Sequence, residues 1–360
     1  MNFSLFLGQY QGIKVFIHWT FSIILIWILI ANTRAGVALV DTAWSIIFIL
    51  SLFFCVILHE FGHALTAKKY GIKTKDIILF PIGGVARLEK LPEDPFHELW
   101  VALAGPLVNL AIFAGLAIVI SIAGFDSSTF NELHLNEDSI LLYLAISNLI
   151  LALFNLIPAF PMDGGRVLRA MLSIRLSRVK ATEIAGSIGQ FLAMGFVFLG
   201  LFYNPFLVVI GLFIYLGAQA EMTQTKNSSL LDGFLVKDAL MTNFPLITVD
   251  APLSLAIDKL LAGQATHFLV VKGEAPIGTL SKDEIIKGLK ISGELSEVGK
   301  SCNFQPLKLD FHQPLEEALK QMSALGKKVA LVYENNHFLG ILDRENITEF
   351  IMVKSALENK

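Results

Sequence analysis

The sequence predicts an α-helical polytopic membrane domain with six spans and a small β-hairpin, followed by a soluble α+β unit. The first observation is composition: the 360 residues are 54% hydrophobic and 16% charged, whereas soluble domains carry about 25% charged residues. The second is that the long apolar runs all lie within residues 1–222, while about half of the charges lie in residues 223–360. The third is a repeated sequence pattern within residues 231–353.

Six apolar runs are predicted to span the membrane. They cover residues 15–31, 42–66, 97–123, 139–155, 184–203 and 205–221. Residues 1–14 form a mildly polar lead, and Asn204 and Pro205 separate the last two runs into a tight helical hairpin. We therefore expect six spanning helices, the last two forming this hairpin.

A short β-hairpin is predicted between the second and third spans. Residues 76–89 contain two short apolar runs on either side of Pro81 and Gly84, a pattern typical of strand, turn and strand. A sheet edge at this point could bind an extended peptide by strand addition. An ordinary connecting hairpin explains the same pattern, and the residues do not separate the two interpretations.

Lysine and arginine residues are concentrated in two of the loops. Residues 68–95 and 166–180 are strongly basic, whereas the loops at 32–41, 124–138 and 204–205 contain few basic residues or none. Because basic loops stay on the cytoplasmic side, the alternation predicts a multi-pass protein of the plasma membrane with both termini in the cytoplasm. The sequence has no basic stripe of the kind that binds nucleic acid, so no such partner is expected.

The motif His-Glu-Phe-Gly-His, residues 59–63, ends the second apolar run. In a helix, His59 and His63 are one turn apart on one face, so both imidazoles can bind one zinc ion, with Glu60 beside them as general base toward a metal-bound water. Residue frequencies alone produce this motif in roughly one of 100 chains of this length, so a helix end with interfacial histidines is the competing interpretation. Ionisable side chains at membrane depth favour zinc chemistry because they are costly in hydrocarbon and usually functional.

A second polar site follows the fourth span. Two prolines and two glycines within residues 158–165 interrupt the helix at the point where Asp163 occurs. The loop charges place Asp163 on the same side of the membrane as the two histidines, so it can complete a two-His, one-carboxylate site with a position open for water. A turn residue in Asp-Gly-Gly is the alternative explanation of Asp163.

Three stretches in this order, HEFGH, AGPLVN and NLIPAFPMDGG, resemble the site-2 protease family of intramembrane zinc metalloproteases over about residues 15–220. The resemblance implies one zinc ion per chain, held by His59, His63 and Asp163. It also implies that Glu60 activates water. Contacts with substrate or with the transition state are implied for four further residues: Asn155, Asn109, Gly83 and Gly84.

Two similar units follow the membrane domain. Pro252 and Pro314 begin corresponding helical segments, and Gly278 and Gly340 lie in corresponding strands. Each pair is separated by 62 residues (314 − 252 and 340 − 278), which indicates a duplicated module. Each unit is predicted to run helix, strand, strand, helix.

This duplicated module resembles a tandem pair of CBS domains. The expected boundaries are 223–230 for the linker, 231–292 for the first CBS domain and 293–353 for the second. The resemblance implies an adenine nucleotide as ligand, contacted by Ser281 and Asp283, although these lie two residues apart instead of the usual three. In the second unit Asp343 stands where Ser or Thr is usual, and its carboxylate would repel phosphate. A structural or dimerising pair without ligand is the alternative, and a homodimer through the CBS domains is expected.

Together these features predict an intramembrane zinc endopeptidase that cleaves transmembrane segments of membrane-protein substrates near the cytoplasmic face and is modulated through its CBS domains. Its expected partners are a transmembrane protein substrate and membrane lipid. The alternative is a CBS-gated ion transporter or channel that uses intramembrane His, Glu and Asp side chains as an ion path. That alternative does not explain why the histidine motif and Asp163 lie toward one side of the membrane.

Overall fold

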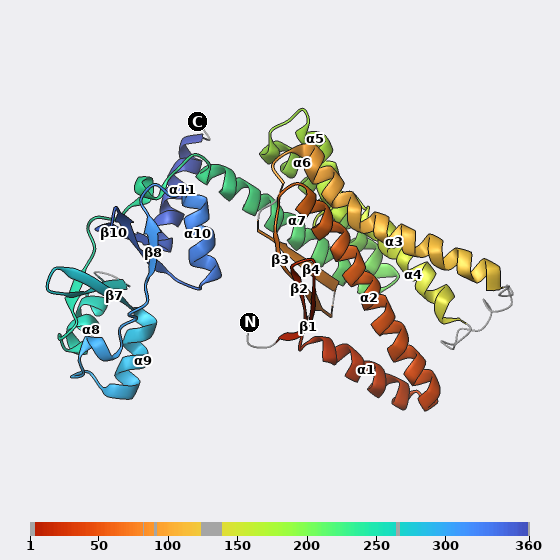
Figure 1. The fold of residues 1–360 in the computed structure, drawn as a ribbon, viewed down its shortest axis with the longest axis horizontal. Helices are drawn as coiled ribbons and strands as arrows, with labels where there is room; N and C mark the ends of the chain where they lie inside the picture. Colours follow the sequence, from red (N-terminus) through yellow and green to blue (C-terminus); the bar gives the residue numbers. More distant parts are fainter. Residues whose placement is uncertain (1–3, 82, 90–91, 124–138, 264–266, 359–360) are drawn as a thin grey trace. The chain divides into compact units, whose positions relative to one another are not determined.

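The computed structural model describes residues 4–81, 83–89, 92–123, 139–263 and 267–358 (Figure 1). The chain divides into two compact units, Met1–Thr225 and Lys226–Lys360, and each is described by itself. The loop at residues 124–138, whose lack of basic residues entered the predicted orientation, lies outside the described residues.

Helices make up most of the described part of the first unit (Figure 1). They are α1 (Phe21–Arg34), α2 (Leu39–Lys69), α3 (Pro95–Ala123), α4 (Ile140–Asn155), α5 (Asp163–Ser173), α6 (Arg178–Phe202) and α7 (Pro205–Leu231). Within the described residues four helices, α2, α3, α6 and α7, are long and apolar enough to cross a membrane. Helices α1 and α4 are apolar but shorter, with 14 and 16 residues. Six spans therefore remain a prediction, because a straight span needs about 20 residues.

The N-terminal residues form strands instead of the predicted polar lead and the start of a span. Strands β1 (Ser4–Tyr10) and β2 (Ile13–His18) pair across a turn in which Gln11 and Gly12 have φ angles of 50° and 90°. Positive φ at both central residues is what a two-residue hairpin turn of this kind requires. The first apolar helix begins only at Phe21, so the prediction of a span from residue 15 was wrong for its first residues.

The predicted small hairpin is half of a four-stranded sheet with the order β1-β2-β3-β4. It consists of β3 (Thr74–Phe80) and β4 (Gly83–Leu88), which pair antiparallel, while β2 pairs parallel with β3. Ile13 of β2 and Ile77 of β3 pack with Ala64 of α2 in one buried cluster. The sheet was missed because its parallel pairing joins segments that are far apart in the sequence, which no local pattern encodes.

The second unit contains two three-stranded sheets, β5-β6-β7 and β10-β9-β8. Its first half contains β5 (Leu246–Thr248), α8 (Leu253–Leu261), β6 (His267–Lys272), β7 (Ala275–Ser281) and α9 (Lys282–Ser292). Its second half contains β8 (Leu307–Asp310), α10 (Leu315–Ala324), β9 (Val329–Glu334), β10 (His337–Asp343) and α11 (Arg344–Glu358). Each half thus has the predicted helix, strand, strand and helix, preceded by a short strand that the sequence pattern did not reveal.

The two halves exchange backbone contacts across a pseudo-twofold arrangement. Met241 forms a β-bridge with Ile341, and Thr279 forms one with Asn303. Adding the repeat length of 62 to 241 and 279 gives 303 and 341, so the two bridges are equivalent contacts. Both halves also share one buried apolar cluster: Leu269, Val271, Val329, Leu331 and Ile341.

The segment predicted as a linker, residues 223–230, is helical. Helix α7 continues through it and ends at Leu231, because the segment contains polar residues but no glycine or proline to interrupt the helix. Leu231 is buried in a core cluster of the second unit. The division between the two units therefore falls inside a continuous helix.

Candidate metal centre

Helix α2 carries the two histidines of the HEFGH motif on one face. His59 and His63 are 6% and 5% exposed, and their Nε2 atoms lie 3.1 Å apart. The spacing of four residues places them one helical turn apart, as the sequence pattern predicts. Two imidazole nitrogens so close together and shielded from water are arranged to share one partner.

Asp163 reaches the same point from α5, of which it is the first residue. Its Oδ2 atom lies 3.1 Å from Nε2 of His63 and 3.3 Å from Nε2 of His59. In the described residues, these three side chains form the one group of at least three His, Cys, Asp or Glu residues with the spacing of metal ligands. Four ligands at about 2.0–2.1 Å from a tetrahedral zinc ion lie about 3.3 Å from each other, so the three observed separations fit zinc.

The protein backbone fixes the orientation of one imidazole. Nδ1 of His63 lies 2.7 Å from the carbonyl oxygen of Val101 on α3. Because a carbonyl oxygen can only accept, Nδ1 carries the proton and Nε2 presents its lone pair to the centre, as is usual for metal-binding histidines. By contrast, Nδ1 of His59 is buried without a hydrogen-bond partner.

Glycines allow the surrounding backbone to approach the centre. A Cβ atom at Gly105 of α3 would overlap the imidazole of His63 and would lie 2.6 Å from Nε2 of His59. A Cβ at Gly165 of α5 would lie 2.7 Å from the backbone of Ala159. The Asp-Gly-Gly sequence therefore allows α5 to begin directly against the turn that precedes it, which brings Asp163 to the histidines.

Glu60 lies next to the edge of the sheet. Its Oε2 atom accepts a hydrogen bond of 2.9 Å from the backbone N–H of Ala86 on β4. Strand β4 ends the sheet order, so this N–H donates to a carboxylate where a further strand would otherwise pair. A Cβ atom at Gly84 would lie 2.7 Å from Cγ of Glu60, so β4 contacts Glu60 closely only because that position is a glycine.

The other residues predicted for this site lie on neighbouring elements. Asn109 lies on α3 one turn after Gly105, is 1% exposed, and has a side-chain oxygen without a hydrogen-bond partner. Asn155 is the half-buried last residue of α4, and Gly83 is the first residue of β4. Of these additional residues, Gly84 is the one with a demonstrated close approach to the HEFGH motif.

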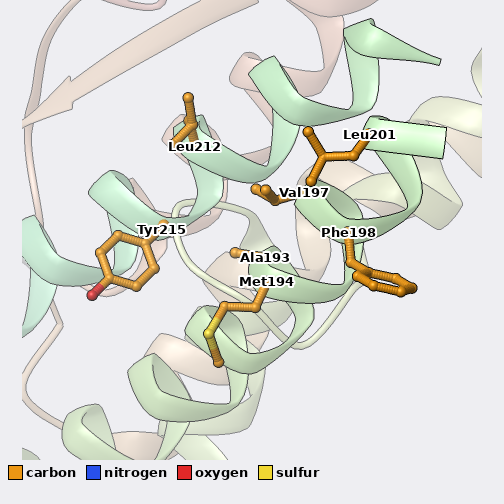
Figure 2. Close-up of a pocket in the computed structure, with 7 residues that line it drawn as sticks. All are labelled: Ala193, Met194, Val197, Phe198, Leu201, Leu212 and Tyr215. Atoms are coloured by element: carbon orange, nitrogen blue, oxygen red, sulfur yellow. The ribbon is translucent and has the colours of Figure 1, made fainter.

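An apolar groove of 360 Å³ lies between α6 and α7 (Figure 2). The lining residues are Ala193, Met194, Val197, Phe198, Leu201, Leu212 and Tyr215. None of them is a candidate metal ligand. The groove suits contact with apolar chains and is not the chemical centre.

The predicted nucleotide-contacting residues of the second unit are engaged with the protein itself. Ser281 caps α9, and its hydroxyl donates to Glu284 at 2.8 Å. Asp283 is exposed and lies 3.0 Å from Nζ of Lys328, whose hydrogen bond lowers the pKa of this carboxyl below its usual value. Asp343, for which the sequence indicated repulsion of phosphate, lies 3.3 Å from Nδ1 of His267.

The structure also contains a buried charged cluster that the sequence analysis missed. Arg169 of α5 lies between Glu98 of α3 and Glu221 of α7. Arg169 lies within residues 166–180, which the sequence analysis treats as a basic loop, although its side chain is fully buried. The sequence did contain a signal for this cluster: Glu98 and Glu221 lie next to long apolar runs. An unpaired charge is costly there, so each carboxylate needs a basic partner.

Comparisons with known proteins give matches in both units of the chain. The sequence model of Peptidase family M50 matches residues 47–136 and 119–196, and that of the CBS domain matches residues 297–353. A zinc metalloprotease of Methanocaldococcus jannaschii is 33% identical over 363 residues, which cover 100% of this chain and 98% of the relative. A Synechocystis protein is 33% identical over 258 residues, 68% of this chain and 66% of that protein.

Among solved structures, the site-2 protease from Methanocaldococcus jannaschii is 40% identical, with a TM-score of 0.46, and the match covers 61% of this chain and 95% of that one. The apolar helices and the buried group of two histidines and one aspartate suit a membrane metallopeptidase. The full-length sequence relationship shows the family: the chain belongs to peptidase family M50, the site-2 proteases. It is a zinc metalloendopeptidase of the intramembrane type with a CBS domain at its C-terminal end.

Proposed function

We propose that His59, His63 and Asp163 hold one zinc ion and that Glu60 is the general base of peptide hydrolysis. The observation that carries this proposal is the convergence of two Nε2 atoms and one carboxylate oxygen within 3.1–3.3 Å of each other. The hydrogen bond from His63 to Val101 supports it, because it aims the lone pair of His63 at the same point. The ligand set leaves a fourth position open, as catalytic zinc sites do.

The chemistry divides between the ion and the protein side chains. When bound, zinc acts as a Lewis acid that polarises the substrate carbonyl and lowers the pKa of water. Glu60, adjacent to His59, takes the proton from the attacking water and returns it to the leaving amine. Asn155 or Asn109 donates an amide hydrogen to the substrate backbone or to the developing oxyanion. The buried side-chain oxygen of Asn109 has no partner, so it can also accept a hydrogen bond from a backbone N–H of the substrate.

We propose that the substrate is a transmembrane segment of another membrane protein, cleaved near the cytoplasmic face. Such a segment must unwind locally to expose a peptide bond, and its backbone then needs new hydrogen bonds. The edge of β4 on either side of Ala86, whose own N–H donates to Glu60, can supply them, with Gly83 and Gly84 leaving room for an extended strand. The contact between Ala86 of β4 and Glu60 supports this, since a strand at that edge lies beside the general base.

We also propose the arrangement of the whole chain: six spans in the plasma membrane, both termini in the cytoplasm, and CBS domains at 231–292 and 293–353 after a linker at 223–230 that is helical. The basic loops support the orientation.

We further propose that the CBS domains modulate cleavage, bind an adenine nucleotide through Ser281 and Asp283, and associate into a homodimer. The continuity of α7 from the first unit to Leu231 supports modulation, because a helix transmits displacement along its axis. The contact of 3.3 Å between Nδ1 of His267 and Oδ2 of Asp343 supports nucleotide binding, since it engages a carboxylate oxygen that would otherwise face phosphate.

The test combines zinc content with cleavage of a model single-span substrate by the full-length protein. We expect one zinc per chain in the wild type, loss of zinc in Asp163→Ala, and a loss of cleavage of about 10²–10⁴-fold in Glu60→Gln with zinc retained. Glu183→Gln, an exposed site on α6, is the matched control and should cleave like the wild type. A folded, metal-replete wild type without zinc would contradict the proposal and direct the work to ion-flux assays of the transporter alternative.

A further inference from the structure

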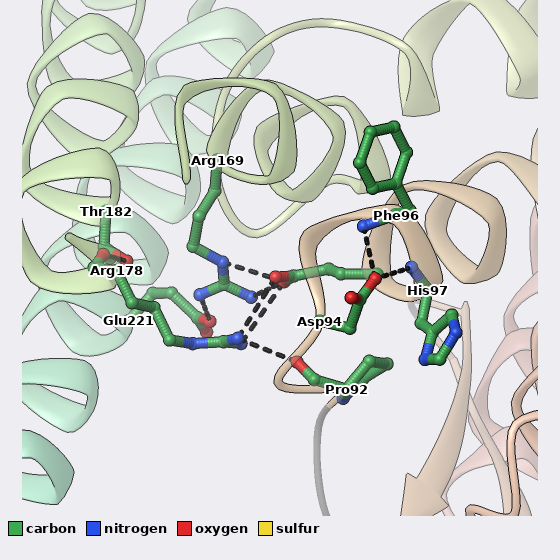
Figure 3. A network of polar contacts seen from close by, with 9 residues as sticks. Pro92, Asp94, Phe96, His97, Arg169, Arg178, Thr182 and Glu221 are labelled. Atoms are coloured by element: carbon green, nitrogen blue, oxygen red, sulfur yellow. Dashed lines mark hydrogen bonds and ion pairs between the residues drawn. The ribbon is translucent and has the colours of Figure 1, made fainter. Parts of the chain in front are cut away.

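A fully buried arginine connects three helices of the first unit (Figure 3). Nε of Arg169 on α5 donates to Oε1 of Glu98 on α3 at 2.8 Å, and a second guanidinium nitrogen donates to the same oxygen. Nη1 of Arg169 donates to Oε1 of Glu221 on α7 at 2.5 Å. The planar guanidinium therefore bridges two carboxylates from different helices, which suits its fork of donors.

The same guanidinium also contacts the turn that leads into Asp163. Its central carbon lies 5.1 Å from the ring centroid of Phe160, within the distance of a cation–π contact. Phe160 precedes Asp163 by three residues and Arg169 follows it by six. Arg169 thus contacts the chain before Asp163 and belongs to the helix that begins with it.

Helix α7 supports this turn along one of its faces. A Cβ atom at Gly217 would lie 2.6 Å from Cδ of Pro161, so α7 and the turn are in close contact. Ala218 belongs to a buried cluster with Phe160, and Ile214 to one with Met162. With Glu221, positions 214, 217, 218 and 221 are i, i+3, i+4 and i+7 of one helix, so a single face of α7 supports the segment that carries Asp163.

We propose that Arg169 is a positioning residue for Asp163. We also propose that two residues of α7 help to position Asp163: Glu221 by binding Arg169, and Gly217 by allowing α7 to pack against Pro161. The inference rests on the proposed function, in which Asp163 binds zinc. Arg169 is not one of the candidate metal ligands. It acts by holding the start of α5 against α3 and α7, so that the Asp163 carboxylate stays within reach of both imidazoles. Groups that orient metal ligands typically contribute about 10- to 100-fold to metal affinity or activity.

The test follows zinc release from the purified full-length protein to excess chelator, together with kcat and KM for a model substrate. Glu221→Gln removes one charge at a partly exposed site. Arg169→Lys keeps the buried positive charge but cannot bridge two carboxylates in the same way. We expect both variants to release zinc about 10-fold faster or more, and to lower kcat while KM stays unchanged.

Gly217→Ala is an independent variant that leaves the charges intact and pushes α7 against Pro161. It should release zinc faster as well. Two controls test whether any change nearby has this effect. Gln219→Ala on α7 removes a 2.9 Å hydrogen bond to Gln190 of α6, and Gly195→Ala on α6 adds a methyl group with no neighbour within 4 Å. Both controls should keep the wild-type release rate.

The outcomes separate the inference from the function beneath it. The inference alone would be overturned if Glu221→Gln, Arg169→Lys and Gly217→Ala all kept the wild-type zinc release rate and kcat. This holds even if their melting temperature falls, because a purely structural cluster changes stability and not the metal site. A wild type that takes up no zinc would overturn the proposed function and the inference together. Faster release in the three variants at a preserved KM supports the positioning role.

Discussion

Gly105 of α3 lies directly against His63 of α2, so that a methyl group on its Cα would overlap Nε2 of the imidazole. Four residues earlier on the same helix, the carbonyl oxygen of Val101 accepts a hydrogen bond from Nδ1 of His63. One turn of α3 therefore both orients this imidazole and leaves room beside its free nitrogen. The first contact uses the backbone carbonyl of Val101, and the second depends on the missing side chain of Gly105.

Gly105→Ala is expected to weaken zinc binding about 10- to 100-fold, because the added methyl group displaces the imidazoles from their common point. Zinc affinity by chelator competition measures the effect. Gly115→Ala on the same helix is the matched control, since a Cβ there has no neighbour within 4 Å. Equal zinc affinity in both variants would mean that α3 does not confine the histidines.

Gly84→Ala is expected to lower kcat about 10-fold or more while zinc content stays at the wild-type level. The new Cβ would lie 2.7 Å from Cγ of Glu60 and would move the carboxylate, and general-base catalysis contributes about 10²–10⁴-fold. Gly8→Ala, in β1 of the same sheet and with no neighbour within 4 Å, should be without effect. Loss of zinc in Gly84→Ala would instead indicate a general disturbance of α2.

Arg87→Met should loosen the hairpin that carries Ala86. Arg87 donates to both carboxylate oxygens of Asp76 across β3 and β4, and this contact raises the pKa of its guanidinium. Asp76 is buried, so removing its partner costs about 1–3 kcal/mol. Faster amide hydrogen exchange in β3 and β4 measures the effect, with exposed Lys75→Met as control. Unchanged exchange would show that the backbone pairing alone holds the hairpin.

Cys302 should react slowly with alkylating agents, because burial, and then the charge of Glu284, raises the pKa of its thiol to about 11. Only the thiolate reacts, so the rate should rise about tenfold per pH unit toward that value. Mass spectrometry of a Cys55→Ser protein isolates the modification at Cys302, and urea-unfolded protein is the control. A rate at pH 7 equal to that of the unfolded chain would contradict the prediction.

The same shift predicts how stability depends on pH. The folded protein keeps the Cys302 proton up to about 11, whereas the ordinary thiol value is 9.0. The folded state therefore binds more protons between these values, so this contribution is fully present below pH 9 and is lost as the pH rises through 11. Cys302→Ser should remove this part of the pH dependence from unfolding curves, and an unchanged curve would assign it to other groups.

The sequence by itself determined the parts of this protein that depend on local spacing. His59 and His63 are four residues apart, and a helix brings them to one face in any tertiary context. The break in the chain at Asp163, the 62-residue repeat and the apolar runs are equally local. Loop charges further indicated that Asp163 and the histidines lie toward one side of the membrane, and the structure brings these side chains within 3.3 Å of each other.

Tertiary structure alone decided the contacts between distant segments. Three contacts join residues that are far apart in the chain: the pairing of β2 with β3, the close approach of Gly84 to Glu60, and the position of Arg169 between Glu98 and Glu221. Such contacts depend on which apolar faces pack together, and many pairings satisfy the same local pattern. For this reason the candidate metal ligands could be predicted from the sequence, whereas the cluster of Arg169, Glu98 and Glu221 became visible only in the folded chain.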